Sequence, residues 1–316
     1  MQLQYAKLGH TGITVCTAPL GAMYLGTKQD RAVSFALLDR YVELGGDFID
    51  TANIYAHWVG EQWRGGESET VLGAWMAERG NRNRLVIASK VGFPYGDAPA
   101  GLGREVIKRE CEKSLRRLGI ETIDLYFAHN DDPALPQEEV LAAFAELIDE
   151  GKVRAIGASN FVTHRLATAN AIARINGLPQ YQVLQPRHTY LRPRRDADFG
   201  PQVPLTDDMA DYCRAADIPI MAYAASLGGA YSGEPGRPVP EQYRSAGNEA
   251  RLAVLGEVAR ETGMAPLQVM FAWLLATPGM MPLVAASSVS QLDFNLAATA
   301  IELSPDQLAR LDAAGE

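Results

Sequence analysis

The stretch IDLYFAHNDDPALPQEEVLAAFAELIDEGKVRAIG, residues 123–157, decides the fold class of this 316-residue chain. It holds an apolar run at 123–127, a helical pattern at 137–150 and a second apolar run at 153–157. Nearly continuous apolar runs are typical of strands that are buried on both faces of a parallel sheet. The stretch therefore predicts one strand–helix–strand unit of an α/β protein.

The same alternation extends in both directions from this unit. A first strand is predicted to end near residues 19–21, and further strands at 47–50, 85–88, 181–184, 218–222 and 281–285. Helices are predicted at about 30–44, 67–79, 103–118, 163–176, 206–216, 249–262 and 289–299. Asp30 fits the N-cap of the first helix, and Gly45-Gly46 fits its end. About eight units in series favour a (β/α)8 TIM barrel, with a doubly wound open sheet as the alternative.

The predicted barrel is a single domain over residues 1–316, with an N-terminal β-hairpin around 9–12 and long loops on its C-terminal face. The segment 228–248 is rich in glycine and proline and follows the seventh strand, so we expect a cofactor-covering lid or a surface loop without a role. The segment 56–66 carries Trp58 and Trp63 among glycines. These two side chains are expected to form a substrate-contacting wall, or else to pack on each other.

Composition excludes several function classes. The net charge of −9 argues against nucleic acid as the main partner, because phosphate binding needs a basic face. The N-terminus lacks the features of a secretory signal, and no apolar run approaches a membrane span. The three cysteines (Cys16, Cys111 and Cys213) fit no metal spacing, and no metal site is evident. We expect a cytoplasmic protein with reduced cysteines and a small-molecule substrate. The sequence carries no indication of an oligomeric state.

Polar residues follow successive predicted strands, where the active sites of such barrels gather. They are Asp50, Thr51, Asn53, Tyr55, Ser89, Lys90, His129, Asn130, Ser159, Asn160, Gln185 and His188. Any one of them fits a capping or solvated role. Burying such a set without partners would cost several kcal/mol for each group, so its convergence predicts a paired polar site.

The residue types suggest acid–base chemistry on a carbonyl compound. An ammonium next to a tyrosine favours the phenolate, so Lys90 is expected to lower the pKa of Tyr55 towards neutrality. Asp50 would keep Lys90 charged, and His129 would donate a hydrogen bond to a carbonyl oxygen. No side chain in the set donates hydride, so a reduction needs a cofactor. Without one, proton abstraction beside a carbonyl is equally compatible with these residues.

The ordered motifs resemble the aldo-keto reductase signature over nearly the whole chain. They are FIDTANIY at 48–55, GESE at 66–69, SKVG at 89–92, DLYFAH at 124–129, GASN at 157–160 and QLDFNL at 291–296. The resemblance implies a catalytic tetrad of Asp50, Tyr55, Lys90 and His129. In this tetrad Tyr55 would be the general acid, and Lys90, paired with Asp50, would tune the acidity of Tyr55. His129 would orient the substrate carbonyl.

The resemblance also implies a nicotinamide cofactor, with NADP(H) preferred to NAD(H). Gly21 and Met23 would approach the nicotinamide ribose, and Ser159, Asn160 and Gln185 would bind the carboxamide. The pyrophosphate would lie under Tyr223, Ala224, Ser226, Leu227 and Gly228. The adenosine end would lie against Ser287, Gln291 and Asn295, with Ser288 beside them, where helix N-terminal amides suit an anion.

Three places depart from the family pattern, one of them the pyrophosphate loop, where the common Tyr-Ser-Pro-Leu reads Tyr-Ala-Ala-Ser at 223–226. His188 stands where the resemblance implies an aromatic ring that stacks on the nicotinamide, and an imidazole can still stack. Ser287 stands where many members carry arginine or lysine for the 2′-phosphate, and a hydroxyl grips a phosphate less strongly than a guanidinium. Trp75 and Trp273 are expected in the core.

The expected activity is NAD(P)H-dependent reduction of an aldehyde or ketone, sugar-derived or aromatic, to an alcohol. One alternative is a cofactor-binding accessory or sensor subunit on the same fold, although no appended helix or basic tail suits such docking. Another is a barrel isomerase or lyase that uses the same tyrosine.

Overall fold

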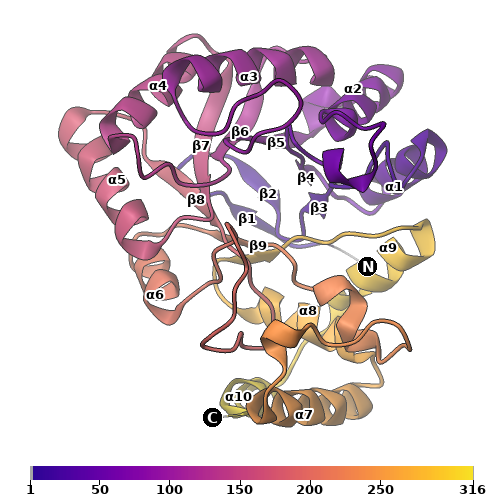
Figure 1. Cartoon of the computed structure of the whole chain (residues 1–316). Coiled ribbons are helices and arrows are strands. Elements are labelled where there is room, and N and C mark those ends of the chain that lie inside the picture. The colour runs from indigo at the N-terminus through magenta and orange to yellow at the C-terminus, as the bar shows by residue number, and fades with distance from the viewer. Residues whose placement is uncertain (1–2, 316) are drawn as a thin grey trace.

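The computed structural model describes residues 3–315, and within them eight parallel strands form one sheet. The strands are β3 (Leu20–Gly21), β4 (Phe48–Asp50), β5 (Val86–Val91), β6 (Ile123–Ala128), β7 (Val153–Ser159), β8 (Tyr181–Gln185), β9 (Ile220–Ala222) and β10 (Met280–Pro282). Each strand pairs with the next along the chain. A parallel bridge from Leu20 to Val284, with a 2.8 Å hydrogen bond from the Gly21 N–H to the Val284 carbonyl, joins the two ends of the sheet. This closure confirms the predicted (β/α)8 barrel and excludes the open sheet (Figure 1).

Helices surround the strands on the outside of the barrel, as Figure 1 shows. They are α1 (Arg31–Glu43), α2 (Glu67–Arg79), α3 (Arg104–Leu118), α4 (Gln137–Asp149), α5 (Thr163–Asn176), α6 (Asp207–Ala215), α7 (Ala246–Thr262), α8 (Pro266–Ala276), α9 (Val289–Leu296) and α10 (Pro305–Ala313). Short 3-10 turns occur as well among the described residues: η1 (His57–Val59), η2 (Arg82–Arg84), η3 (Leu227–Ser232), η4 (Glu241–Tyr243) and η5 (Ala297–Ala300). The sequence prediction lacked α8 and α10, and it began α7 three residues late.

The predicted N-terminal hairpin is formed by β1 (Tyr5–Lys7) and β2 (Thr14–Cys16). Its apolar side chains Leu8, Ile13 and Val15 belong to the same buried cluster as Phe48 and Leu125 from the barrel strands. The hairpin therefore plugs one end of the barrel, and its labels lie over the barrel centre in Figure 1. The catalytic candidates lie at the other end, because they follow the C-terminal ends of the strands.

The predicted ends of α1 are confirmed. The Asp30 carboxylate accepts a 2.9 Å hydrogen bond from the Val33 N–H, and Gly45 after the helix has a φ of 94°. Trp75 is fully buried as expected. The expectation that Trp273 lies in the core is wrong in part, since the ring is half-buried and its indole N–H donates to Asp312 over 2.7 Å.

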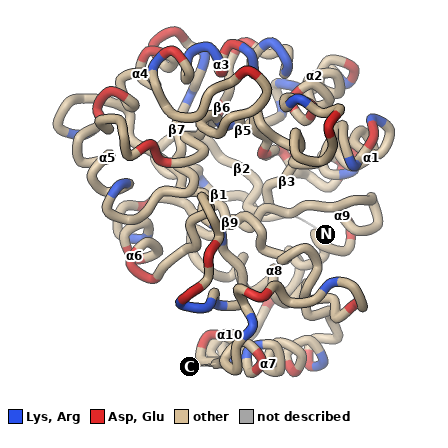
Figure 2. The backbone as a smooth tube through the Cα atoms, viewed as in Figure 1, with Lys and Arg blue, Asp and Glu red and all other residues tan. Residues whose placement is uncertain are grey.

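Charged residues of both signs alternate along the outer helices, as Figure 2 shows for α3 and α4. Arg104 and Lys108 of α3, for example, pair with Glu146 of α4 over 2.7 and 2.8 Å. No helix within residues 3–315 is both long enough and apolar enough to cross a membrane. In the same range, no three His, Cys, Asp or Glu side chains gather as a metal site. The three cysteines are buried and unpaired.

Candidate active site

Three neighbouring strands bring the predicted tetrad together at the C-terminal end of the barrel. Asp50 ends β4, Lys90 lies on β5, and His129 directly follows β6. Tyr55 comes from the loop after β4 and packs in one cluster with Tyr95, against which Met23 also lies. All four tetrad side chains are buried, with at most 9% of their surface exposed.

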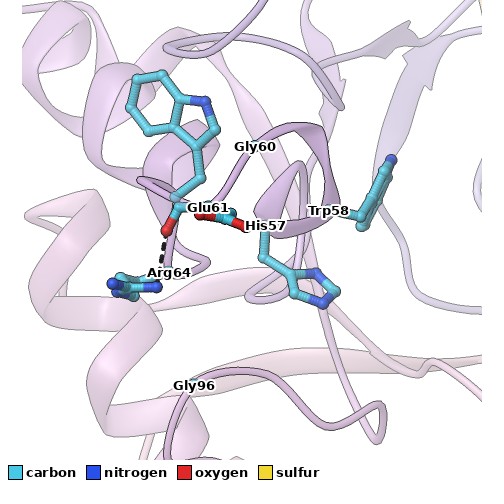
Figure 3. Close-up of a pocket in the computed structure, with 7 residues that line it drawn as sticks. His57, Trp58, Gly60, Glu61, Arg64 and Gly96 are labelled. Carbon is cyan, nitrogen blue, oxygen red and sulfur yellow. Dashed lines mark hydrogen bonds between the residues drawn. The ribbon is translucent and has the colours of Figure 1, made fainter.

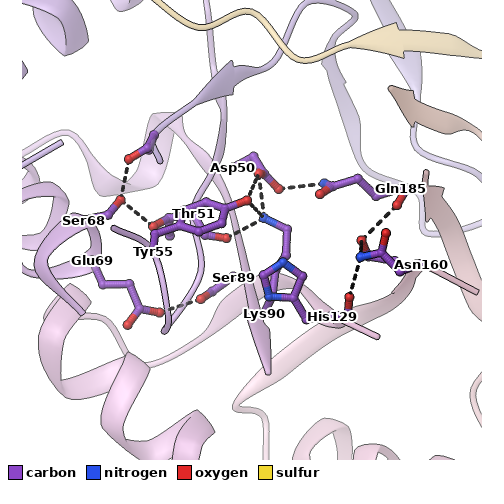
Figure 4. Close-up of polar contacts among 12 residues, drawn as sticks. Asp50, Thr51, Tyr55, Ser68, Glu69, Ser89, Lys90, His129, Asn160 and Gln185 are labelled. Carbon is purple, nitrogen blue, oxygen red and sulfur yellow. Dashed lines mark hydrogen bonds and ion pairs between the residues drawn. The ribbon is translucent and has the colours of Figure 1, made fainter. Parts of the chain in front are cut away.

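The ammonium group of Lys90 is the centre of this arrangement (Figure 4). It donates to the Asp50 carboxylate over 2.6 Å, to the Thr51 carbonyl over 2.8 Å and to the Tyr55 hydroxyl over 2.6 Å. The Tyr55 hydroxyl in turn donates to the same Asp50 oxygen over 3.2 Å. The buried charge of Lys90 is therefore paired and fully hydrogen-bonded, which is what an ion needs away from water.

The electrostatics of Tyr55 correct one expectation. Burial, with the nearby Asp50 carboxylate, raises the pKa of Tyr55 well above its usual value, so the expected lowering by Lys90 is wrong for this arrangement. Burial also lowers the pKa of Lys90, against the opposing effect of Asp50 and Glu69. Tyr55 consequently holds its proton at neutral pH, and what it offers is a proton rather than a base.

His129 adds a neutral imidazole beside the phenol. Its ring meets the Tyr55 ring edge-on with centroids 5.9 Å apart, and the Phe93 ring at 4.8 Å. Burial and the charge of Lys90 keep the pKa of His129 well below its usual value. Its Nδ1 atom is buried without a hydrogen-bond partner. A neutral imidazole has one N–H to donate, which suits a carbonyl oxygen.

A second set of side chains adjoins the tetrad from the C-terminal ends of β7, β8 and β9. The Gln185 amide donates to Asp50 over 2.9 Å, and the Ser159 hydroxyl donates to the Gln185 carbonyl over the same distance. The Asn160 amide donates to the His129 carbonyl over 2.8 Å. The Tyr223 hydroxyl donates to the side-chain oxygen of Asn160 over 2.7 Å. The structure thus joins these predicted cofactor residues to the tetrad through direct contacts.

The loop after β9 has an unusual backbone. Ala224 and Leu227 have φ values of 56° and 47°, and Gly228 has 66°, all in the left-handed region. Ser226, just before Leu227, is right-handed helical. A right-handed residue followed by a left-handed one turns successive N–H groups towards one point, a concave arrangement that binds anions. In the segment 228–248 the chain forms η3 and η4.

The N-terminus of α9 carries the residues predicted for the adenosine end. Ser287 donates to the Gln291 side chain through its N–H over 2.7 Å and through its hydroxyl over 2.9 Å. Ser288 caps the helix by accepting from the Gln291 N–H, and Asn295 donates to the Ala285 carbonyl over 2.9 Å. The sequence 283–295 contains no lysine or arginine.

His188, predicted to stack on the cofactor, lies against Trp273 of α8, with ring centroids 6.1 Å apart. Burial and the charge of Arg251 lower the pKa of His188 to about 4. The backbone N–H of His188 donates to the backbone carbonyl of Tyr223 over 3.1 Å. Tyr223, in contrast to His188, has a side chain that is hydrogen-bonded to Asn160, one of the residues predicted to bind the nicotinamide carboxamide.

The lowered pKa of His188 predicts a pH dependence of stability. The unfolded chain takes up a proton near pH 6.5, whereas the folded state resists it until about pH 4. Stability from this residue is present above pH 6.5 and is lost as the pH falls towards 4. We expect the melting temperature of His188→Phe to fall less between pH 7 and pH 5 than that of the wild type. Equal falls in the two proteins would show that His188 does not resist protonation.

The predicted substrate wall borders a surface hollow of about 370 Å³ (Figure 3). Trp58 and Trp63 line it, together with His57, Gly60, Glu61, Arg64 and Gly96. Trp58 is half exposed, at 50%, and its ring meets that of His57 edge-on at 5.3 Å. The two tryptophans thus lie in the loop that begins directly after Tyr55, with no tetrad residue lining the hollow.

Comparison with known proteins agrees with this geometry. A family model described as the aldo/keto reductase family matches residues 19–316. The chain belongs to this family. Relatives of this aldo-keto reductase include norsolorinic acid reductase stcV of Emericella nidulans, 31% identical over 95% of this chain and 78% of the relative. The uncharacterized oxidoreductase YrpG of Bacillus subtilis is 30% identical over 98% and 95% of the two chains. The aldo-keto reductase ausK of Aspergillus calidoustus is 30% identical over 96% and 80%.

The membership gives this aldo-keto reductase a general activity. It is an oxidoreductase of a family that reduces carbonyl compounds with nicotinamide cofactors, usually NADPH. Sequence reasoning missed the side chains behind the tetrad. Ser68 and Glu69 stood only as part of the GESE motif, and nothing local indicated that Glu69 pairs with Arg117, 48 residues away.

Proposed function

We propose that this protein reduces an aldehyde or ketone to an alcohol with NAD(P)H, and that Tyr55 donates the proton. The observation that carries the proposal is the ammonium of Lys90, held 2.6 Å from both the Asp50 carboxylate and the Tyr55 hydroxyl in a buried site. An acid, its charged neighbour and the carboxylate that holds the neighbour are the parts that proton delivery to a carbonyl needs.

The reaction follows from the state of these groups. When bound, the nicotinamide supplies the hydride that no side chain can supply. His129, neutral, donates a hydrogen bond to the carbonyl oxygen and stabilises the negative charge that develops there. Tyr55 then gives its proton to the nascent alkoxide. Its raised pKa is no obstacle, because an alkoxide is a far stronger base than a phenolate.

The residues around the tetrad fit a nicotinamide dinucleotide. Ser159, Asn160 and Gln185 offer hydroxyl and amide groups to a carboxamide. The Leu227 N–H donates to the Ala224 carbonyl over 3.0 Å, so the backbone N–H groups on either side of it, those of Ser226 and Gly228, are the ones proposed to face a pyrophosphate. The bond from Tyr223 to Asn160 favours Tyr223 as the stacking ring, and the contact of His188 with Trp273 favours a supporting role for the imidazole. Gly21 and Met23 are proposed to border the ribose.

We propose NADP(H) rather than NAD(H), because the family usually uses NADPH. The absence of lysine and arginine from residues 283–295 leaves the 2′-phosphate to Ser287, Gln291 and the α9 N–H groups. The substitution Ser287→Arg is therefore expected to tighten NADP⁺ binding by about tenfold or more, because it adds a charge-assisted bond, and to leave NAD⁺ binding unchanged. Titration calorimetry with both dinucleotides measures this. Equal tightening of both would show that the arginine does not reach the 2′-phosphate.

The substrate is proposed to be a sugar-derived or aromatic carbonyl compound that contacts Trp58 and Trp63. Indole faces bind flat rings well, and the loop that carries both tryptophans starts next to Tyr55. Two relatives bear the name norsolorinic acid reductase, at 31% and 29% identity. We further propose that residues 1–316 act as one domain in the cytoplasm.

The test is loss of the reduced-nicotinamide absorbance with a panel of aromatic aldehydes, ketones and sugar aldehydes. Turnover with at least one member of the panel is expected. Binding of NADP(H) without turnover of any member would contradict the proposal and favour a cofactor-binding sensor.

A further inference from the structure

Glu69 is a buried carboxylate behind the tetrad, in the first turn of α2. None of its surface is exposed. Its Oε1 accepts a 2.5 Å hydrogen bond from the Ser89 hydroxyl, and its Oε2 accepts from the Arg117 guanidinium over 2.7 Å. Ser89 directly precedes Lys90 on β5. Glu69 is therefore hydrogen-bonded to β5 at the residue next to Lys90.

Ser68, the preceding residue, reaches Lys90 by a second route. The Ser68 hydroxyl donates to the Ala22 carbonyl over 2.7 Å, and the Thr51 hydroxyl lies 2.7 Å from the Ser68 hydroxyl. The Thr51 carbonyl is one of the three acceptors of the Lys90 ammonium. The first turn of α2 thus fixes the strand that carries Lys90, and it also fixes Thr51, whose carbonyl accepts a hydrogen bond from the Lys90 ammonium (Figure 4).

Two glycines allow α2 to begin at this point. Gly65 and Gly66 have φ values of 89° and 90°, in the region that favours glycine. A Cβ on Gly66 would lie 2.5 Å from Cδ of Arg117, so only glycine lets that side chain pass over the helix start to reach Glu69. An ion pair between the exposed faces of α2 and α3 would not require this close contact between Arg117 and the helix start. The close contact is needed only because Arg117 reaches the buried Glu69.

We propose that Ser68 and Glu69 are positioning residues for Lys90, which hold its ammonium against the Tyr55 hydroxyl and keep it protonated. This inference rests on the proposed function, because its purpose is to keep Tyr55 in a proton-donating arrangement. Ser68 acts on position through Thr51. Glu69 fixes the position of Lys90 through its hydrogen bond with Ser89. Its negative charge also favours the protonated form of Lys90 without direct contact.

The charged and titratable groups around Lys90 make the sign of the effect clear. Asp50 and Tyr55 contact it, His129 faces it from β6, and Glu69 faces it from α2 with Arg117 of α3 behind. Cys111 and Tyr126, whose thiol and phenol have pKa values raised by burial, also interact electrostatically with Glu69. Burial lowers the pKa of Lys90, and both Asp50 and Glu69 oppose that lowering. Without the negative charge of Glu69, Lys90 loses its proton at a lower pH.

The test measures Lys90 directly, in the protein without cofactor or substrate. In protein labelled with [13Cε]lysine, the signal that disappears in Lys90→Met belongs to Lys90, and its chemical shift follows the charge of the ammonium. The variant Glu69→Gln keeps the shape and removes the charge. We expect its Lys90 signal to titrate at lower pH than that of the wild type, and the alkaline limb of kcat/KM to move in the same direction.

The variant Ser68→Ala is expected to lose about threefold to tenfold in kcat, the equivalent of one hydrogen bond, with KM unchanged. Thr70→Ala is the matched control, because Thr70 is exposed in the same turn and bonds only to the Gly66 carbonyl. It should match the wild type in titration and in kcat. If Glu69→Gln does not fold, Glu69→Gln/Arg117→Met removes both members of the pair without leaving a buried charge, and its Lys90 titration should still fall.

An unchanged Lys90 titration in whichever of these two variants folds would overturn the assignment of Glu69. Unchanged kcat in Ser68→Ala would overturn that of Ser68. A shifted Lys90 signal in a protein that reduces no carbonyl compound would instead contradict the proposed function, so the two failures are distinguishable.

Discussion

Tyr55→Phe is expected to lower kcat/KM for carbonyl reduction by about three orders of magnitude. The substitution removes one oxygen, and with it the group that we propose delivers a proton to the alkoxide, and such a general acid contributes about 10²–10⁴ in rate. The ring itself stays, so the packing of residue 55 against Tyr95 and Met23 is retained. The loss should fall on kcat, because a transition-state interaction is removed.

Binding of NADP(H) provides the control, since no residue proposed to bind the cofactor depends on the Tyr55 hydroxyl for its contacts. We expect the dissociation constant to change by less than about twofold, within the error of most titrations. Retained turnover in Tyr55→Phe would show that another group donates the proton. Loss of both turnover and cofactor binding would point to a collapsed site, and a near-ultraviolet circular dichroism spectrum would reveal it.

Lys90→Met is expected to lose both activity and stability. Asp50, 1% exposed, would keep its hydrogen bonds from Gln185 and Tyr55 but would lose the cation that neutralises it. Removing one partner of a buried pair destabilises a protein by about 3–5 kcal/mol. Two hydrogen bonds from neutral donors remain, so we expect a value near 3 kcal/mol in urea denaturation. The turnover number should fall by about 10²–10⁴, because Tyr55 loses its ordered neighbour.

The double variant Asp50→Asn/Lys90→Met separates the two effects. Removing both charges leaves no unpaired ion, so most of the lost stability should return while the activity stays low. Recovery of activity together with stability would mean that Lys90 serves only to balance Asp50. That outcome would contradict a role for the ammonium in orienting the Tyr55 proton.

The part of the site that was predictable from the sequence follows from one rule of the fold. Polar residues after parallel strands meet at one end of a barrel, so Asp50, Lys90 and His129 could be grouped without coordinates. The effect of burial on the pKa values of the site residues could not be predicted from the sequence. The sequence suggested that Lys90 lowers the pKa of Tyr55, and in the structure burial and Asp50 outweigh it.

The elements that sequence patterns missed have physical explanations. The helix α8 is buried on most of its surface, so its apolar residues show no stripe and do not reveal the helical period. Contacts such as Glu69 with Arg117 or Trp273 with Asp312 join residues 48 and 39 positions apart. No local pattern records such a distance, because only the packing of the helices in the folded chain brings these residues together.

The hairpin at the opposite end of the barrel limits how solvent protons exchange with the buried ammonium. Leu8, Ile13 and Val15 close that end with apolar side chains, so we expect deuterons from bulk water to reach Lys90 from the C-terminal end of the barrel, where the proposed reactants would bind. A molecule bound at that end of the barrel should block the access of water to Lys90 and slow the exchange. Hydrogen–deuterium exchange at the ends of β4 and β5 should then report occupancy of the site without any chemical turnover.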